Sequence, residues 1–72
     1  MNRAEHLAWA KGRALQELEA GSTTTALASI QSDLRKHPEL ADHTGLGLMM
    51  ALAMGGHLTT HSEVREFIEG LR

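Results

Sequence analysis

The chain has 72 residues, no cysteine, and a formal net charge of −2 from seven Lys/Arg and nine Asp/Glu. This length fits one helical domain over residues 1–72, and a domain of this size buries only about 60–65% of its unfolded surface, which leaves a small margin of stability. The absence of cysteine excludes disulfides and fits a reducing cytoplasm. The acidic balance without a basic block argues against binding nucleic acid through phosphate contacts.

The first predicted helix starts after Asn2 and runs to Ala20. Asn2, followed by Glu5 three residues later, has the spacing of a capping box, and Gly21 supplies the left-handed residue that commonly ends a helix. Residues 1–5 lead directly into this helix-forming sequence, so no apolar signal segment is expected there.

The second predicted helix begins after a cap at Ser22 or a neighbouring threonine. It ends near His37, because Pro38 disfavours a helical conformation in the residue before it. Its apolar stripe follows helical spacing and comprises Leu27, Ile30 and Leu34. Residues 38–43 are expected to form a turn or one loose helical turn. The first two helices therefore predict an αα-hairpin.

The third predicted helix covers residues 45–54, with Thr44 as its cap and Gly55 and Gly56 at its end. Its apolar residues point to all sides of the axis, and no charge interrupts them; they are Leu46, Leu48, Met49, Met50, Leu52 and Met54. A short helix that is apolar on every side is most simply buried at the centre of a fold. The run is far shorter than the ~20 residues that a membrane span needs.

The fourth predicted helix covers residues 61–69, with Thr60 and Glu63 at capping-box spacing and Gly70 at its end. No segment shows the alternating pattern of a strand. The predicted fold class is therefore all-α, a compact array of four short helices with an apolar central third helix.

Trp9 is the most unusual residue of the first helix, because its position predicts a tryptophan on the polar side. It lies nearly opposite the apolar side of the first helix, which comprises Ala4, Leu7, Ala14, Leu15 and Leu18. A tryptophan beside an arginine and a glycine has the composition of an interface hot spot. The candidate interface is therefore Glu5, Trp9, Gly12, Arg13 and Gln16. The alternative is that the first helix packs on two sides and Trp9 belongs to the core.

The methionines of the third helix, Met49, Met50 and Met54, fit either an adaptable binding groove or the packing of a core. We expect core packing, because no charged residue lies near them in a helix that we expect to be buried.

No metal site or cofactor is expected. His57 and His61 have a four-residue spacing that can bind a metal on one helix, but Gly55, Gly56 and the Thr60 cap break the helix between them. Cysteine or carboxylate ligands at recognisable spacing do not complete the set. The histidines are better explained as cap, turn and surface residues, with one hydrogen-bonded in the core.

The end of the second helix is the only locally basic stretch. Arg35, Lys36 and His37 complement the helix dipole there, and they are weak candidates for ligand binding. Ser32, Asp33 and His37 could be drawn as a catalytic triad, but no strained turn holds the serine and no oxyanion hole is apparent. We predict no catalytic residue, and an enzyme is not expected.

Several segments resemble a family of small proteins encoded by tailed bacteriophages, especially those of actinobacteria. They are Glu5-His6-Leu7, Trp9, residues 32–39, Gly56-His57-Leu58, Thr60 and residues 64–70. The resemblance spans nearly the whole chain, and it departs at His61, where proline is expected, and at Leu71 and Arg72, where an aromatic ending is expected. It implies a phage or prophage product in the host cytoplasm and brings no activity that transfers to residues of this chain.

The residue patterns predict a non-enzymatic protein that binds protein, as a homo-oligomer or as an inhibitor of a host factor. The resemblance implies that it is a phage accessory protein. Self-association would also add stability to a chain with a small core. Neither a membrane nor a nucleic-acid partner is expected. The alternative is a small-ligand binder for nucleotides or nucleic acid, which would use Arg13, Arg35, Lys36 and the histidines.

Overall fold

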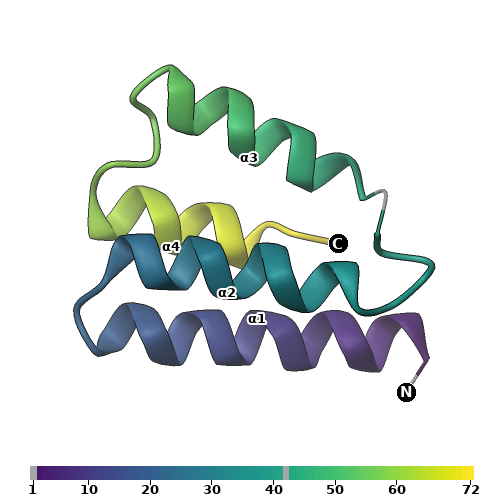
Figure 1. The fold of residues 1–72 in the computed structure, drawn as a ribbon. Coiled ribbons are helices and arrows are strands. Elements are labelled where there is room, and N and C mark those ends of the chain that lie inside the picture. The colour runs from purple at the N-terminus through teal and green to yellow at the C-terminus, as the bar shows by residue number, and fades with distance from the viewer. Residues whose placement is uncertain (1, 42) are drawn as a thin grey trace.

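The computed structural model describes residues 2–41 and 43–72, and these form four α-helices and no strand (Figure 1). The helices are α1 (Arg3–Glu19), α2 (Thr23–Arg35), α3 (Thr44–Met54) and α4 (His61–Glu69). The predicted all-α fold with four helices is confirmed. Met1, which precedes the predicted first helix, and position 42, in the predicted turn, lie outside the described residues.

Local hydrogen bonds set most of the helix ends as predicted. Asn2 Oδ1 accepts from the Glu5 backbone N–H at 2.8 Å, Glu5 Oε1 accepts from the Asn2 N–H at 3.2 Å, and α4 has the same reciprocal box. Gly21 follows α1 with a φ of 102°, a conformation that costs glycine little. The second helix ends at Arg35, two residues before the predicted end.

The N-cap of α3 differs from the prediction. The helix begins at Thr44 and its cap is His43, whose Nδ1 accepts from the Gly45 backbone N–H at 2.8 Å. The other ring nitrogen, Nε2, donates to the main-chain oxygen of Arg72 at 2.5 Å. The imidazole therefore joins the start of α3 to the segment that follows α4.

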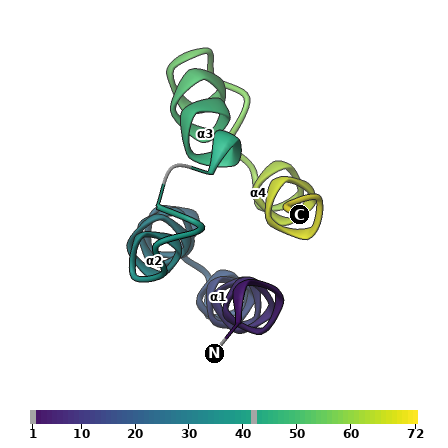
Figure 2. The ribbon, with the colours of Figure 1, turned by 90° about the vertical axis from the view of Figure 1, so that its right-hand side faces the viewer.

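Helices α1, α2 and α4 pack against one another, and α1 and α2 form the predicted antiparallel hairpin (Figures 1 and 2). Three alanines on this contact are fully buried and allow the helix axes to approach closely; they are Ala10, Ala14 and Ala26. The larger core residues are Leu7, Leu18, Ile30, Leu34, Leu40, Met49, Leu58, Val64, Ile68 and Leu71. Ala4 lies on the predicted apolar side but is exposed, in the first turn of α1.

Helix α3 lies at the edge of the fold, on the side of α2 and α4 that faces away from α1 (Figure 2). Met49 joins the core and is 8% exposed, whereas Leu48, Met50 and Met54 are 55%, 58% and 85% exposed. The predicted central burial of the third helix was therefore wrong. The other three helices are amphipathic and cover one another's apolar sides, so α3 is left to cover one edge of a core that they already form.

The segment after α4 ties α1 to the start of α3. Lys11 Nζ donates to the carbonyls of Glu69 and Leu71 at 3.0 and 2.8 Å, which satisfies groups left open at the end of α4. Leu71 is buried against α3, and a Cβ built on Gly45 would lie 2.5 Å from Leu71 Cδ2. Glycine at this position therefore lets Leu71 approach the backbone of α3.

The size of the molecule is ordinary for its length. The radius of gyration is 11.2 Å and the accessible surface is 4390 Å², against about 11 Å and about 4400 Å² for a compact chain of this length. The unusual feature is thus the apolar character of the surface on α3 rather than the total surface area. None of the described helices has the length and apolar content to span a membrane.

Candidate functional site

Trp9 is half-buried at the edge of the contact between α1 and α2. The Arg13 guanidinium lies 5.0 Å from the centre of its ring, and Nζ of Lys36 lies 5.8 Å from it. The His6 ring is 5.2 Å away, centre to centre. Cation–π contact of this kind stabilises the pairing of the two helices, because Lys36 comes from the end of α2. Trp9 thus has partners within its own chain.

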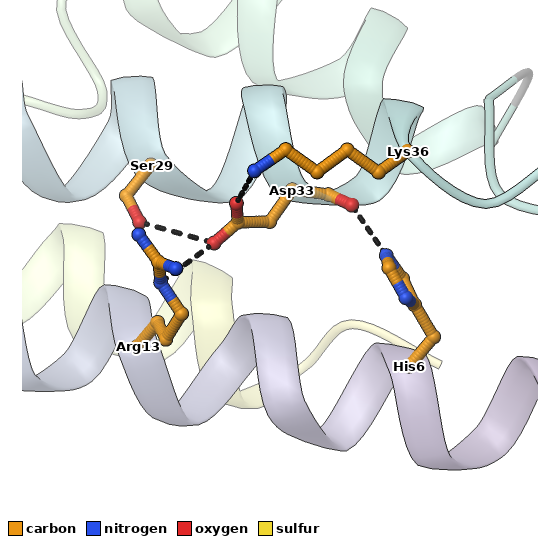
Figure 3. A network of polar contacts seen from close by, with 5 residues as sticks. All are labelled: His6, Arg13, Ser29, Asp33 and Lys36. Atoms are coloured by element: carbon orange, nitrogen blue, oxygen red, sulfur yellow. Dashed lines mark hydrogen bonds and ion pairs between the residues drawn. The ribbon is translucent and has the colours of Figure 1, made fainter. Parts of the chain in front are cut away.

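Asp33 is the centre of a polar cluster between α1 and α2 (Figure 3). Its side chain is 2% exposed, and its carboxylate accepts from Arg13 Nε at 3.1 Å and from Lys36 Nζ at 3.2 Å. The Ser29 hydroxyl adds a longer contact of 3.4 Å. A buried carboxylate needs such partners, because an unpaired charge away from water is strongly unfavourable. The pairing therefore fixes where α2 lies along α1.

His6 completes this cluster from the start of α1. It is 8% exposed, and its Nε2 donates to the main-chain oxygen of Asp33 at 2.5 Å (Figure 3). Its ring also lies 5.2 Å from that of His37. We call His6, Arg13, Ser29, Asp33 and Lys36 the Asp33 cluster. All buried side-chain nitrogen and oxygen atoms among the described residues have a hydrogen-bond partner, so the Asp33 cluster is internally satisfied.

The structure brings some of the predicted site residues together and leaves others apart. Trp9, Arg13 and Lys36 meet at the Asp33 cluster, and His37 lies beside His6. Glu5 serves the cap of α1, while Gly12, Gln16 and Arg35 are exposed. Whether the Trp9 side of α1 contacts a partner, or Arg35, Lys36 and His37 bind a ligand, stays a prediction. Arg13 and Lys36 already pair with the Asp33 carboxylate.

The burial of Asp33 was not predicted, and His6 was not singled out as the histidine that is hydrogen-bonded in the core. His6 lies one helical turn before Ala10 and two before Ala14, on the side of α1 that the structure buries, so this spacing could have identified it. Asp33 adjoins Leu34 within the basic stretch, and charged residues in such a stretch are normally exposed. The partner that permits its burial, Arg13, lies 20 residues earlier, and only the register of the hairpin reveals the pair.

The side of α3 that faces away from the core presents a second candidate surface. Gly47, Met50, Ala51 and Met54 are all exposed there, and we call these four residues the α3 outer face. No Lys, Arg, Asp or Glu occurs between Thr44 and Glu63. Contiguous exposed apolar surface of this kind marks interaction sites more often than isolated apolar residues do. The core-packing interpretation of the methionines holds for Met49 and was wrong for Met50 and Met54.

A groove of about 330 Å³ adjoins the α3 outer face and separates α3 from α2. Its lining carries no charged side chain and consists of Thr24, Leu27, Ala28, Gln31, Met49, Met50 and Ala53. Methionine adapts its shape to what it contacts, which suits an apolar protein surface better than a polar small molecule.

Two histidines outside the Asp33 cluster stabilise the fold. His61 Nε2 donates to the Leu18 carbonyl at 2.8 Å and links α4 to the end of α1, and His43 caps α3. Within residues 2–41 and 43–72, no group of three or more His, Cys, Asp or Glu is placed to hold a metal ion.

Comparison with known proteins adds no relative. No protein-family model matches the chain, and no curated protein or solved structure is significantly similar to it. The functional argument therefore depends on the two surfaces described above.

Proposed function

We propose that this chain is a non-enzymatic protein that works by protein–protein contact, and that the α3 outer face makes the contact. The main observation behind this proposal is that Met50 and Met54 are 58% and 85% exposed on a helix without charged residues. Burying apolar surface stabilises a complex by about 25 cal/mol per Å². An exposed methionine surface gains most from an apolar, uncharged partner surface, because charged groups would lose hydration there without gaining a partner.

The resemblance to small phage proteins supplies a setting for this proposal. In that setting the protein is a phage or prophage accessory product that acts in the cytoplasm of a bacterial host, on itself or on a host factor. The absence of a charged side chain from the groove beside α3 supports an apolar protein partner over a nucleotide or nucleic acid.

The experiment is a capture assay with three tagged baits: the wild type, Met54→Glu, and Trp9→Ala. Each bait is incubated with bacterial lysate that contains untagged copies of the chain at about 1 mM and is chemically crosslinked before washing, so that weak contacts survive. Retained proteins are identified by mass spectrometry. We expect a protein that the wild type and Trp9→Ala retain and that Met54→Glu loses, because a carboxylate on the α3 outer face is incompatible with an apolar partner. Retention by Met54→Glu and loss by Trp9→Ala would instead assign the contact to the Trp9 side of α1. Failure of the wild type to retain any protein overturns the proposed function.

A further inference from the structure

The α3 outer face has a pattern of large and small residues that is complementary to itself. At 100° per residue, Gly47, Met50, Ala51 and Met54 lie within an arc of about 100°. Large and small side chains alternate there in chain order: Gly, Met, Ala, Met. A Cβ placed on Gly47 would meet nothing within 4 Å, so the space above this glycine is open.

We infer that the partner of the α3 outer face is a second copy of this chain, whose α3 lies antiparallel to the first across a two-fold axis; this inference rests on the proposed function. With the axis between Met50 and Ala51, Gly47 faces Met54 of the second copy, and Met50 faces Ala51 of the second copy. A two-fold interface requires the same surface to be complementary to itself. Here each methionine meets a small residue in both directions.

The charges of the chain also favour a second copy at this place. Each copy carries a formal charge of −2, and the repulsion between two copies is smallest when they meet through a region without charge. The segment between Thr44 and Glu63 has no acidic or basic side chain. A different partner is commonly recognised through complementary charges at the rim, and neither the α3 outer face nor the lining of the adjacent groove provides one.

The size of α3 sets the expected strength of the association. Its 11 residues give a length of about 16 Å, and one side of such a helix presents roughly 300 Å². A standard interface takes about 800 Å² from each partner, and smaller ones are transient. Even with part of the groove beside α2 included, the dimer is therefore weak, with a dissociation constant of the order of 100 μM.

The first experiment measures the dissociation constant by sedimentation equilibrium from about 10 μM to about 1 mM. Gly47→Leu fills the space that Met54 of the second copy needs, and it should raise the dissociation constant at least about tenfold. The matched control is Gly12→Leu on α1, where a Cβ also meets nothing within 4 Å. This control should stay within about twofold of the wild type. Equal effects of the two variants, or a larger effect of Gly12→Leu, overturn the inference.

The second experiment tests the antiparallel arrangement with disulfides, since the natural chain has no cysteine that could interfere. Gly47→Cys and Met54→Cys proteins are mixed in equal amounts and oxidised mildly. In the inferred arrangement the two positions meet, whereas each lies about 10 Å along the axis from its own equivalent, beyond the reach of a disulfide. The mixed disulfide should therefore exceed the statistical half of the dimers. Homodisulfides at or above the statistical share would contradict the antiparallel arrangement.

These outcomes separate this inference from the proposed function. A wild type that stays monomeric at about 1 mM, while it retains a host protein in the capture assay, overturns the second copy as partner and leaves the proposed function standing. A wild type that dimerises, and whose dimer Gly47→Leu leaves unchanged, overturns the α3 outer face as the contact.

Discussion

Two regions of the molecule differ in how far their side chains are paired: the contact between α1 and α2, and the α3 outer face. Between α1 and α2, a buried carboxylate, two cations and an imidazole pair within the chain, and their register is fixed by those pairs. On α3, the other helices cover only some of the apolar side chains. Leu48, Met50 and Met54 stay mostly exposed. The comparison teaches that the polar cluster fixes how α1 and α2 pair, whereas the apolar side chains of α3 stay exposed, which is why we propose α3 as the contact surface.

The same substitution at Leu18 and Leu48 should give the largest contrast. Leu18 is fully buried and Leu48 is 55% exposed. Leu18→Ala should reduce the free energy of unfolding by about 3 kcal/mol, because it removes buried methyl groups and leaves a cavity. Leu48→Ala should change it by less than about 1 kcal/mol. Urea denaturation at low protein concentration measures both values, and similar losses would show that α3 belongs to the core after all.

The double variant Arg13→Met with Lys36→Met should have the next largest effect. It leaves the Asp33 carboxylate buried without a cation, and we expect a loss of about 2 kcal/mol in the free energy of unfolding. This figure allows for water near the two cations, whose side chains are 48% and 57% exposed. Arg35→Met, at an exposed neighbouring position, is the control and should change stability by less than about 0.5 kcal/mol. A loss no larger than that of the control would mean that the Asp33 cluster does not hold the hairpin together.

A pair of glycine variants tests how α3 is attached. Gly45→Ala would bring a methyl group within 3 Å of Leu71 Cδ2 and His43 Nδ1, at 2.5 and 2.8 Å, and should destabilise by about 1 kcal/mol despite the better helix propensity of alanine. Gly47→Ala meets nothing within 4 Å and should stabilise the monomer by up to about 1 kcal/mol. Thermal unfolding and hydrogen exchange of the α3 amides, both at low concentration, measure the two effects. Stabilisation by Gly45→Ala would exclude the close contact with Leu71.

The smallest effect concerns the cap of α4 and acid. Hydrogen bonds from the Thr60 backbone and then from its side chain, together with those from Thr59, lower the pKa of the Glu63 carboxyl below 4.5. Because the folded state lowers this pKa, the stabilisation is present above about pH 4.5 and is lost as the pH falls through the folded value. Glu63→Gln should remove this part of the acid dependence of stability, as measured by denaturation between pH 3 and 6 (about the range in which the group titrates). If the variant keeps the same acid dependence as the wild type, the capping hydrogen bonds of Glu63 do not contribute to it.

Local signals in the sequence predicted the helices well. Asn2 with Glu5, and Thr60 with Glu63, define helix starts through hydrogen bonds between residues three apart, and Gly21 defines a stop through its backbone conformation. Such interactions need no knowledge of tertiary contacts. The helix boundaries agree with the prediction to within two residues for this reason.

Two features could not be predicted in the same way. The place of α3 depends on which side of the helix is buried, and a helix with Leu48 and Met54 as apolar as Met49 carries no such preference. The burial of Asp33 depends on Arg13, which lies on another helix, and on the register that α1 and α2 adopt together. Trp9 and Arg13 were correctly grouped on one side of α1, but their neighbour Lys36 comes from the far end of α2.

Trp9 also determines what can be observed of this protein in solution. It is the only tryptophan, and the chain contains no tyrosine. Its contacts come from His6, Arg13 and Lys36, so its fluorescence reports on whether α1 and α2 are joined. Helix α3 supplies none of these contacts, and pairing between two copies of α3 should leave the emission spectrum unchanged. Intrinsic fluorescence is therefore a clean measure of unfolding, whereas association needs a dye placed on α3.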